Sequence, residues 1–128
     1  MDLKKLVEEQ RLSNFPIGLG GCRISDFHFD SCEYNIVVFD GKSKPEKIIK
    51  SGDEFVIFHH ASLSETMSQK LLQYDKLQII QDESWDLRML LSKINEKRSS
   101  LFTDFAKNCL IESMFCCQKT KEAIQTSD

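Results

Sequence analysis

The sequence predicts an α+β fold, in which a small β-sheet is covered by helices and two more helices follow at the C-terminal end. Two observations support this fold class. Short runs rich in β-branched and aromatic residues alternate with helical segments over residues 1–82, whereas residues 83–128 show helical spacing alone. We therefore expect a sheet-containing domain over 1–82 and a helical extension over 83–128 that packs on it or on a partner.

The composition is typical of one folded domain. The chain has 128 residues, of which 41% are hydrophobic and 29% charged, and its net charge is -3. A chain of this charge has no global attraction to nucleic acid or membranes. The amphipathic start "MDLKKLVEEQRLS" is not a signal peptide, and no apolar run approaches the ~20 residues of a membrane span. We expect a cytoplasmic protein without a membrane partner, and nucleic-acid binding is not indicated.

The five cysteines show neither a C-x-x-C pair nor the spacing of zinc ligands. An odd number of cysteines without such a pattern is typical of reduced thiols in an intracellular protein. We therefore expect all five to be reduced. They are Cys22, Cys32, Cys109, Cys116 and Cys117.

The first elements follow from apolar spacing. Leu3, Leu6 and Val7 recur at helical spacing after Asp2, a typical N-cap residue, and predict a helix over residues 2–13. The segment "FPIGLGG" predicts a short strand between turn residues. The uninterrupted apolar run in "YNIVVF", residues 34–39, predicts a strand that is buried on both faces.

Two more strands are predicted at "EKIIK" and "EFVIFHH", with the turn "SGD" between them. Ser62 and Glu65 then have the spacing of a capping box, which predicts a helix with Met67, Leu71 and Leu72 on its inner face. "KLQIIQD" predicts a short closing strand. The segment "DGKSKP" predicts a turn, and we interpret its basic residues, together with the following Lys47, as a solvated loop.

Two helices are predicted in the C-terminal part. The first starts near Trp85, with apolar residues at spacings of three and four: Leu87, Leu90, Leu91 and Ile94. The last runs from about Leu101 to Ile124 and is apolar over most of its circumference, so it must be buried on several sides. Either it packs on the sheet and the preceding helix, or it forms an interface with a second copy or another protein, or it begins a helical domain.

The segment "GCRISDFHFDSCEYNIVVF" resembles the motif of minimal nucleotidyltransferases, members of the DNA polymerase beta superfamily. In that family a strand leads through a Gly-Ser turn into a short helix, and an Asp-x-Asp pair then enters an apolar strand. Here Gly21, Cys22 and Arg23 occupy the turn. Glu33 lies twelve residues past Gly21, and Asn35 stands where the second Asp belongs.

The resemblance continues through "DEFVIFHHASLSETMSQKLLQYDKLQIIQD", where Glu54 occupies the third carboxylate position. It covers residues 1–82 and implies a nucleotidyltransferase-like mixed sheet. It also implies that Glu33, Asn35 and Glu54 are the catalytic residues and bind Mg²⁺, which stabilises charge on the phosphates of an NTP. Gly21, Cys22 and Arg23 would bind those phosphates.

The sequence departs from the family at each of these positions. Cys22 replaces the Ser, and Glu33 and Glu54 replace Asp. Asn35 is neutral, and a loss of ~3 kcal/mol there would weaken metal or transition-state binding more than a hundredfold. Asp26 stands in place of a later Gly. We therefore expect a degenerate, catalytically impaired module that binds a nucleotide or a partner in a regulatory role.

Two alternatives remain open for the function. One is an active Mg²⁺-dependent nucleotidyltransferase that modifies a protein or RNA hydroxyl. The other is a structural dimerisation module built around residues 101–124.

Three histidines lie near the expected site. His59 and His60 end a strand and point to opposite faces, so at most one of them would face the site. The alternative is that each is simply a polar residue at the end of the strand. His28 lies between Phe27 and Phe29, whose rings would either stack on a base or cover an edge of the sheet.

Small nucleotidyltransferases of this type often act with a helical HEPN partner in toxin–antitoxin pairs. The segment "LFTDFAKNCLIESMFCCQKTKEAI" is similar to the first helix of a HEPN domain, although the chain contains no Arg-x4-6-His motif. The resemblance implies an antitoxin-like protein that forms a homodimer or binds a helical protein partner through residues 101–124.

Overall fold

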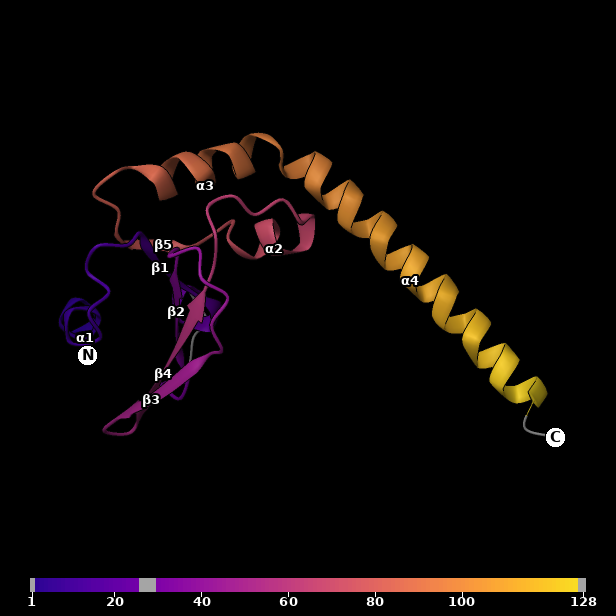
Figure 1. Ribbon diagram of the computed structural model, residues 1–128, viewed down its shortest axis with the longest axis horizontal. Helices are drawn as coiled ribbons and strands as arrows, with labels where there is room; N and C mark the ends of the chain where they lie inside the picture. The colour runs from indigo at the N-terminus through magenta and orange to yellow at the C-terminus, as the bar shows by residue number, and fades with distance from the viewer. Residues whose placement is uncertain (1, 26–29, 127–128) are drawn as a thin grey trace.

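A computed structural model describes residues 2–25 and 30–126, and these form an α+β fold (Figure 1). The α+β prediction is confirmed. In chain order the elements are α1 (Leu3–Glu9), β1 (Ile17–Gly20), the 3-10 helix η1 (Gly21–Ile24), β2 (Tyr34–Val38), β3 (Lys47–Ser51), β4 (Glu54–His60), α2 (Ser68–Gln73), β5 (Gln78–Gln81), α3 (Asp86–Glu96) and α4 (Arg98–Thr126).

The strands form one mixed sheet in the order β3-β4-β2-β1-β5. The pair β2 and β4 is parallel, and the other neighbours are antiparallel. In the parallel pair Asn35 lies opposite Ile57 and Val37 lies opposite His59. Since side chains alternate along a strand, Asn35, Val37 and His59 share one face of the sheet, and Glu54 lies on the other.

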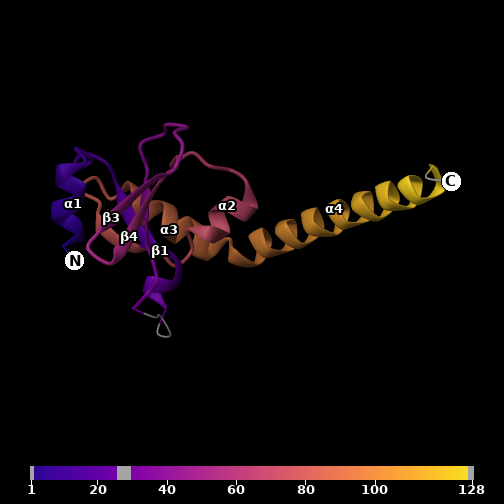
Figure 2. The same cartoon turned by 90° about the horizontal axis from the view of Figure 1, so that it is seen from below.

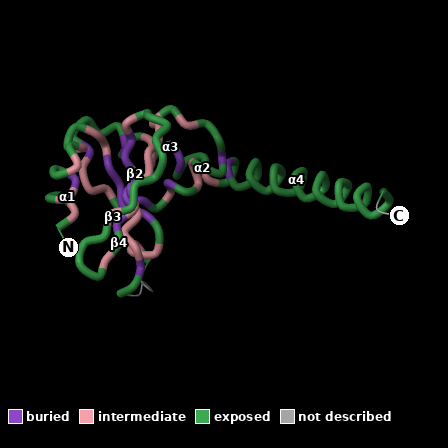
Figure 3. The backbone as a smooth tube through the Cα atoms, turned by 60° about the horizontal axis from the view of Figure 1, so that its bottom comes forward, coloured by how far each residue is buried: buried purple, intermediate pink, exposed green. Residues whose placement is uncertain are grey.

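Each face of the sheet supports its own hydrophobic core. On one face Ile36, Val38, Val56 and Phe58 pack with Val7 of α1. On the other face a second cluster joins the sheet to α2, α3 and the start of α4: Phe39, Tyr74, Leu77, Leu87, Ile94 and Leu101. Buried backbone therefore runs through the sheet and under the helices (Figure 3). The prediction that β2 is buried on both faces is confirmed only in part: Ile36 and Val38 are buried on the α1 face, whereas Asn35 and Val37 on the other face are half-buried and border an open cleft.

The first helix is shorter than expected. Asp2 caps it as predicted, since its carboxylate accepts a hydrogen bond from the Lys5 N–H at 3.2 Å. The helix nevertheless ends at Glu9 rather than near residue 13. Arg11 adopts a left-handed backbone with φ 59°, and this conformation turns the chain toward β1.

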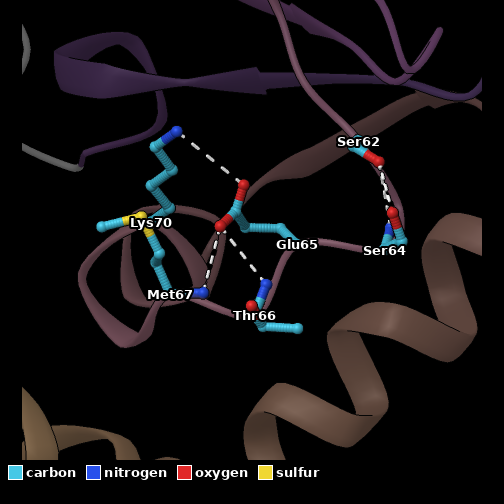
Figure 4. A network of polar contacts seen from close by, with 6 residues as sticks. All are labelled: Ser62, Ser64, Glu65, Thr66, Met67 and Lys70. Carbon is cyan, nitrogen blue, oxygen red and sulfur yellow. Dashed lines mark hydrogen bonds and ion pairs between the residues drawn. The ribbon is translucent and has the colours of Figure 1, made fainter.

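The predicted capping box before α2 is wrong. The Ser62 hydroxyl bonds to Ser64 at 2.8 Å instead of capping the helix. The Glu65 carboxylate accepts hydrogen bonds from the N–H groups of Thr66 and Met67, as Figure 4 shows. The helix starts later than predicted, at Ser68, so Met67 precedes it and is 49% exposed rather than on the inner face.

Other helical predictions agree with the structure. Leu71 and Leu72 pack against the second core, as do Leu90 and Leu91 of α3. Leu87 and Ile94 are buried in that core. β5 (Gln78–Gln81) lies within the predicted strand "KLQIIQD", so this strand and the helix that follows it are confirmed.

The last helix differs most from expectation. α4 begins at Arg98 and projects away from the rest of the chain (Figures 1 and 2). Only Leu101 is buried among its described residues, and residues 102–126 are all exposed. Of the alternatives left open for this helix, packing on the sheet is not the one that the structure shows, because α4 leaves the second core after its first turn. Over residues 2–25 and 30–126, no helix has the length and apolarity needed to cross a membrane.

Candidate functional site

A cleft of about 540 Å³ lies over the sheet face that carries Asn35 and His59. The ends of β1, β2 and β4 form its floor, and α2 forms one wall. The opposite wall is the loop of residues 41–46 between β2 and β3. The cleft therefore brings together three segments that are distant in the sequence.

A continuous chain of polar contacts crosses this floor. The Asn35 Nδ2 donates a hydrogen bond to Glu33 Oε1 at 3.3 Å. The Asn35 Oδ1 lies 2.9 Å from His59 Nε2, and His59 Nδ1 lies 3.0 Å from Glu46 Oε1. Both polar atoms of the Asn35 side chain are engaged, and both ring nitrogens of His59 face an acceptor. The parallel register of β2 and β4 creates this arrangement, because it places His59 opposite Val37, two residues beyond Asn35.

Of the three residues implied as Mg²⁺ ligands, the structure brings only Glu33 and Asn35 together. Glu54 lies on the other face of the sheet, 3.8 Å from the Arg23 guanidinium. Among the described residues, no three His, Cys, Asp or Glu side chains gather as metal ligands would. The residues present therefore do not fit the carboxylate set of a two-metal site.

The residues implied for phosphate binding are also divided. Gly21 lines the cleft in a left-handed conformation, with φ +75°, and a Cβ there would lie 2.6 Å from Asn35 Nδ2. Cys22 forms a disulfide with Cys32, so the prediction of reduced thiols is wrong for this pair. Arg23 contributes to the same loop: its guanidinium donates to the carbonyls of Asp30 and Cys32, both at 2.8 Å.

Arg23 therefore points away from the cleft. Its guanidinium also lies over the Tyr34 ring, 4.3 Å from the centroid. Arg23 and Cys22 stabilise the loop that leads into β2, whereas Gly21 shapes the cleft.

The charges around the cleft favour an anion. Three lysines, Lys42, Lys44 and Lys70, line it with two carboxylates, Glu46 and Glu65, and Glu46 is engaged by His59. Lys70 is paired with Glu65 at 3.8 Å, whereas Lys42 and Lys44 form no ion pair within residues 2–25 and 30–126. The loop interpreted from sequence as solvated is thus a wall of the cleft that supplies two unpaired ammonium groups.

The acidic residue at the edge of this floor is readily ionised. The backbone N–H of Glu33, and then the Asn35 side chain, lower the pKa of the Glu33 carboxyl below its ordinary value.

The predicted aromatic segment Phe27, His28 and Phe29, and Asp26 before it, lie outside the described residues.

Sequence reasoning missed a buried pair that supports the lysine wall. The Asp40 carboxylate lies 2.8 Å from His60 Nδ1, and these side chains are 2% and 9% exposed. Asp40 also accepts a hydrogen bond from the Lys42 N–H at 3.1 Å, which fixes the start of the loop. The only signal in the sequence is the Asp-Gly turn that follows the apolar strand.

This pair predicts a pH-dependent contribution to stability. Burial raises the pKa of the Asp40 carboxyl. The hydrogen bond from the Lys42 N–H, and then the hydrogen bond and charge of His60, outweigh burial and hold this pKa below its ordinary value of 3.8. A lowered pKa means that the stabilisation is present above the pKa of the unfolded chain and is lost as the pH falls through the folded value.

Asp40→Asn should lower the free energy of unfolding by about 1.5–3 kcal/mol at pH 7, because a charged hydrogen bond to a buried partner is lost. Urea unfolding at pH 7 and below pH 4 measures this. The difference from wild type should shrink below pH 4, and Asp53→Asn, in the turn before β4, is the control. An equal difference at both pH values would contradict this role for Asp40.

The sequence was compared with known proteins. It matches no protein-family model, and the search of curated proteins found no match.

Proposed function

We propose that this chain is a nucleotidyltransferase-like domain that binds the phosphates of a nucleotide in the cleft and has lost ordinary metal-dependent transfer. The central observation is the combination of two unpaired lysines, Lys42 and Lys44, with a cleft that lacks the implied carboxylate set. Lysines stabilise phosphate as point charges and need no metal for this.

The order of the elements supports the family resemblance. A strand, β1, leads through Gly21 into the short η1, and Glu33 and Asn35 then enter the apolar β2. The later strand β4 lies parallel to β2, and α2 and β5 follow it. This is the succession that the resemblance implies for residues 1–82.

The contacts of Asn35 support the loss of transfer chemistry. A metal-binding carboxylate at this position would present free oxygens, whereas the Asn35 Oδ1 is occupied by His59 and its Nδ2 by Glu33. Glu54 would have to cross to the other face of the sheet to reach them. An active Mg²⁺-dependent transferase is therefore the less supported alternative.

The exposed α4 supports a regulatory, partner-binding role. Its large apolar side chains stand in solvent, among them Phe102, Leu110 and Met114, which are 54%, 62% and 64% exposed. We propose that a second copy or a helical protein partner covers this helix, as in an antitoxin-like assembly. The same observation favours the structural dimerisation module as a second candidate.

Nucleotide binding is tested by calorimetric titration of ATP into the full chain, with Mg²⁺ and separately with EDTA. We expect binding in both conditions. Lys42→Ala and Lys44→Ala should each weaken it about tenfold, since a charge-assisted hydrogen bond contributes about 1.5–3 kcal/mol. Lys50→Ala, a lysine of β3 outside the cleft, is the matched control and should bind as wild type does.

Inorganic triphosphate in the same titration separates the phosphates from the base. No heat at millimolar ATP, or equal affinity in the Lys42, Lys44 and Lys50 variants, would overturn phosphate binding in this cleft. Turnover of labelled ATP with Mg²⁺ that disappears in Glu33→Gln would overturn the loss of transfer chemistry instead.

A further inference from the structure

The face of α4 that points away from the rest of the chain carries no charge. Around the start of α4, its residues Leu101, Asp104 and Ile111 share a surface hollow with Met67 and Ser68. At 100° per residue, the opposite side of the helix is centred near Ser113. That side therefore faces solvent, and the whole of the projecting helix beyond Leu101 is exposed (Figure 3).

This face has a heptad pattern. Uncharged residues follow one another at alternating spacings of four and three over three heptads, the pattern of a helix-pairing seam. They are Phe102, Ala106, Cys109, Ser113, Cys116, Thr120 and Ala123, and all are exposed. We call these residues the α4 seam.

The polar members of the α4 seam do not need water. The Ser113 hydroxyl donates to the Cys109 carbonyl at 2.9 Å, and the Thr120 hydroxyl donates to the Cys116 carbonyl at 2.8 Å. Since each hydroxyl is satisfied within its own helix, burial of the seam leaves no hydroxyl donor unpaired. The seam can therefore be covered along its length.

The charges beside the α4 seam select the occupant. Glu112 and Lys119 lie on the same flank, seven residues apart, and neither forms an ion pair within the described chain. In an antiparallel pair of identical helices, residues on this flank of one helix meet the same flank of the other. If Ser113 of one copy lies opposite Cys116 of the second copy, Glu112 lies beside Lys119 of the second copy, and the reverse pair forms as well.

A parallel pair does not create these contacts. There, residues on this flank face the other flank of the second copy, so Glu112 meets Cys117 and finds no charge. The complementarity of Glu112 and Lys119 thus fits a second copy of this chain in the antiparallel direction.

We propose that two copies associate through the α4 seam as an antiparallel helix pair, with Glu112 and Lys119 forming two reciprocal ion pairs. This rests on the proposed role of α4 as a partner helix and names the partner. The seam from residue 102 to 123 is about 32 Å long at 1.5 Å per residue. Because α4 projects from the domain (Figure 1), an antiparallel pair places the two domains at its opposite ends.

The test is the mass of the full chain in solution, measured by sedimentation over a concentration series. Glu112→Lys and Lys119→Glu should each raise the dimer dissociation constant at least about tenfold, because both attractive contacts become repulsive. The double variant Glu112→Lys with Lys119→Glu should return to within about twofold of wild type. Cys116→Asp, which places a charge in the seam, should give a monomer.

Phe115→Ala is the matched control. Phe115 is 64% exposed but lies outside the seam, so its truncation should leave the dimer unchanged. Mass spectrometry of the denatured chain excludes cross-linking through the exposed cysteines Cys109, Cys116 and Cys117.

A monomer at all concentrations would overturn the proposal, and a dimer that ignores the charge swap would overturn its antiparallel register. A loss of dimer in Phe115→Ala but not in Cys116→Asp would assign the interface to another face. ATP titration into Glu112→Lys separates the two proposals: wild-type ATP affinity in a monomeric variant means that the cleft works without the helix pair. Failure of ATP binding in a dimeric wild type would instead affect only the proposed cleft.

Discussion

Phe58→Ala should lower the free energy of unfolding by about 3–5 kcal/mol, the range for removing a fully buried aromatic ring. Phe58 lies in β4 and is 2% exposed, between Val56 and the buried residues of β2. The ring packs in the core that joins the sheet to Val7 of α1. The loss includes both the transfer free energy of the ring and the cavity that it leaves.

Urea unfolding followed by circular dichroism measures this loss, and Phe55→Ala in the same strand is its matched control. Phe55 has the same side chain, but it is 47% exposed and lies on the opposite face. We expect Phe55→Ala to change the free energy of unfolding by less than about 1 kcal/mol. Equal losses in the two variants would mean that β4 does not occupy the register found here.

The strands were predictable because their local pattern and their burial agree. β2 and β4 are apolar runs at the centre of the sheet, and both were predicted within a residue or two of their bounds. α3 was predictable for the same reason, since Leu87 and Ile94 lie one above the other on its buried side. In these segments a single spacing fixes both the secondary structure and the face that is covered.

The candidate site was only partly predictable, because its geometry depends on the sheet register. The sequence indicated Glu33 and Asn35 from their spacing to Gly21, but it placed Glu54 with them. The parallel pairing of β2 with β4 puts His59 beside Asn35 instead, and His59 lies at the opposite end of β4 from Glu54, where the carboxylate was expected. Local spacing does not encode how far one strand slides along its neighbour.

Long-range covalent and electrostatic pairs were missed for a related reason. Cys22 and Cys32 are ten residues apart in the sequence and form a disulfide, and Arg23 beside Cys22 donates to the carbonyls of Asp30 and Cys32. α4 was expected to be buried because its apolar residues surround the helix. Apolar character indicates that a surface needs covering, but it does not say whether the same chain or a second one covers it.

A buried carboxylate at the start of α3 links the sheet to the helical extension. Asp82 follows β5, and its side chain is fully buried. One oxygen accepts the Leu87 N–H at 3.1 Å and the other accepts the Arg88 N–H at 2.9 Å. These N–H groups belong to the first turn of α3 and have no partner within the helix. Asp82 thus caps α3 from outside and holds Leu87 in the second core.

Asp82→Ala should lower the free energy of unfolding by about 2–3 kcal/mol, because the buried Leu87 N–H and the part-buried Arg88 N–H lose a charged acceptor. Asp86→Ala is the matched control: Asp86 is also acidic and begins α3, but its carboxylate accepts its hydrogen bond from the exposed Ser84 hydroxyl. The control loses the interaction of a charge with the helix dipole, about 0.3–1 kcal/mol, while the cap remains. Urea unfolding of both variants separates the two effects. If Asp86→Ala were as destabilising as Asp82→Ala, the helix dipole rather than the buried cap would account for the attachment of α3 to the sheet.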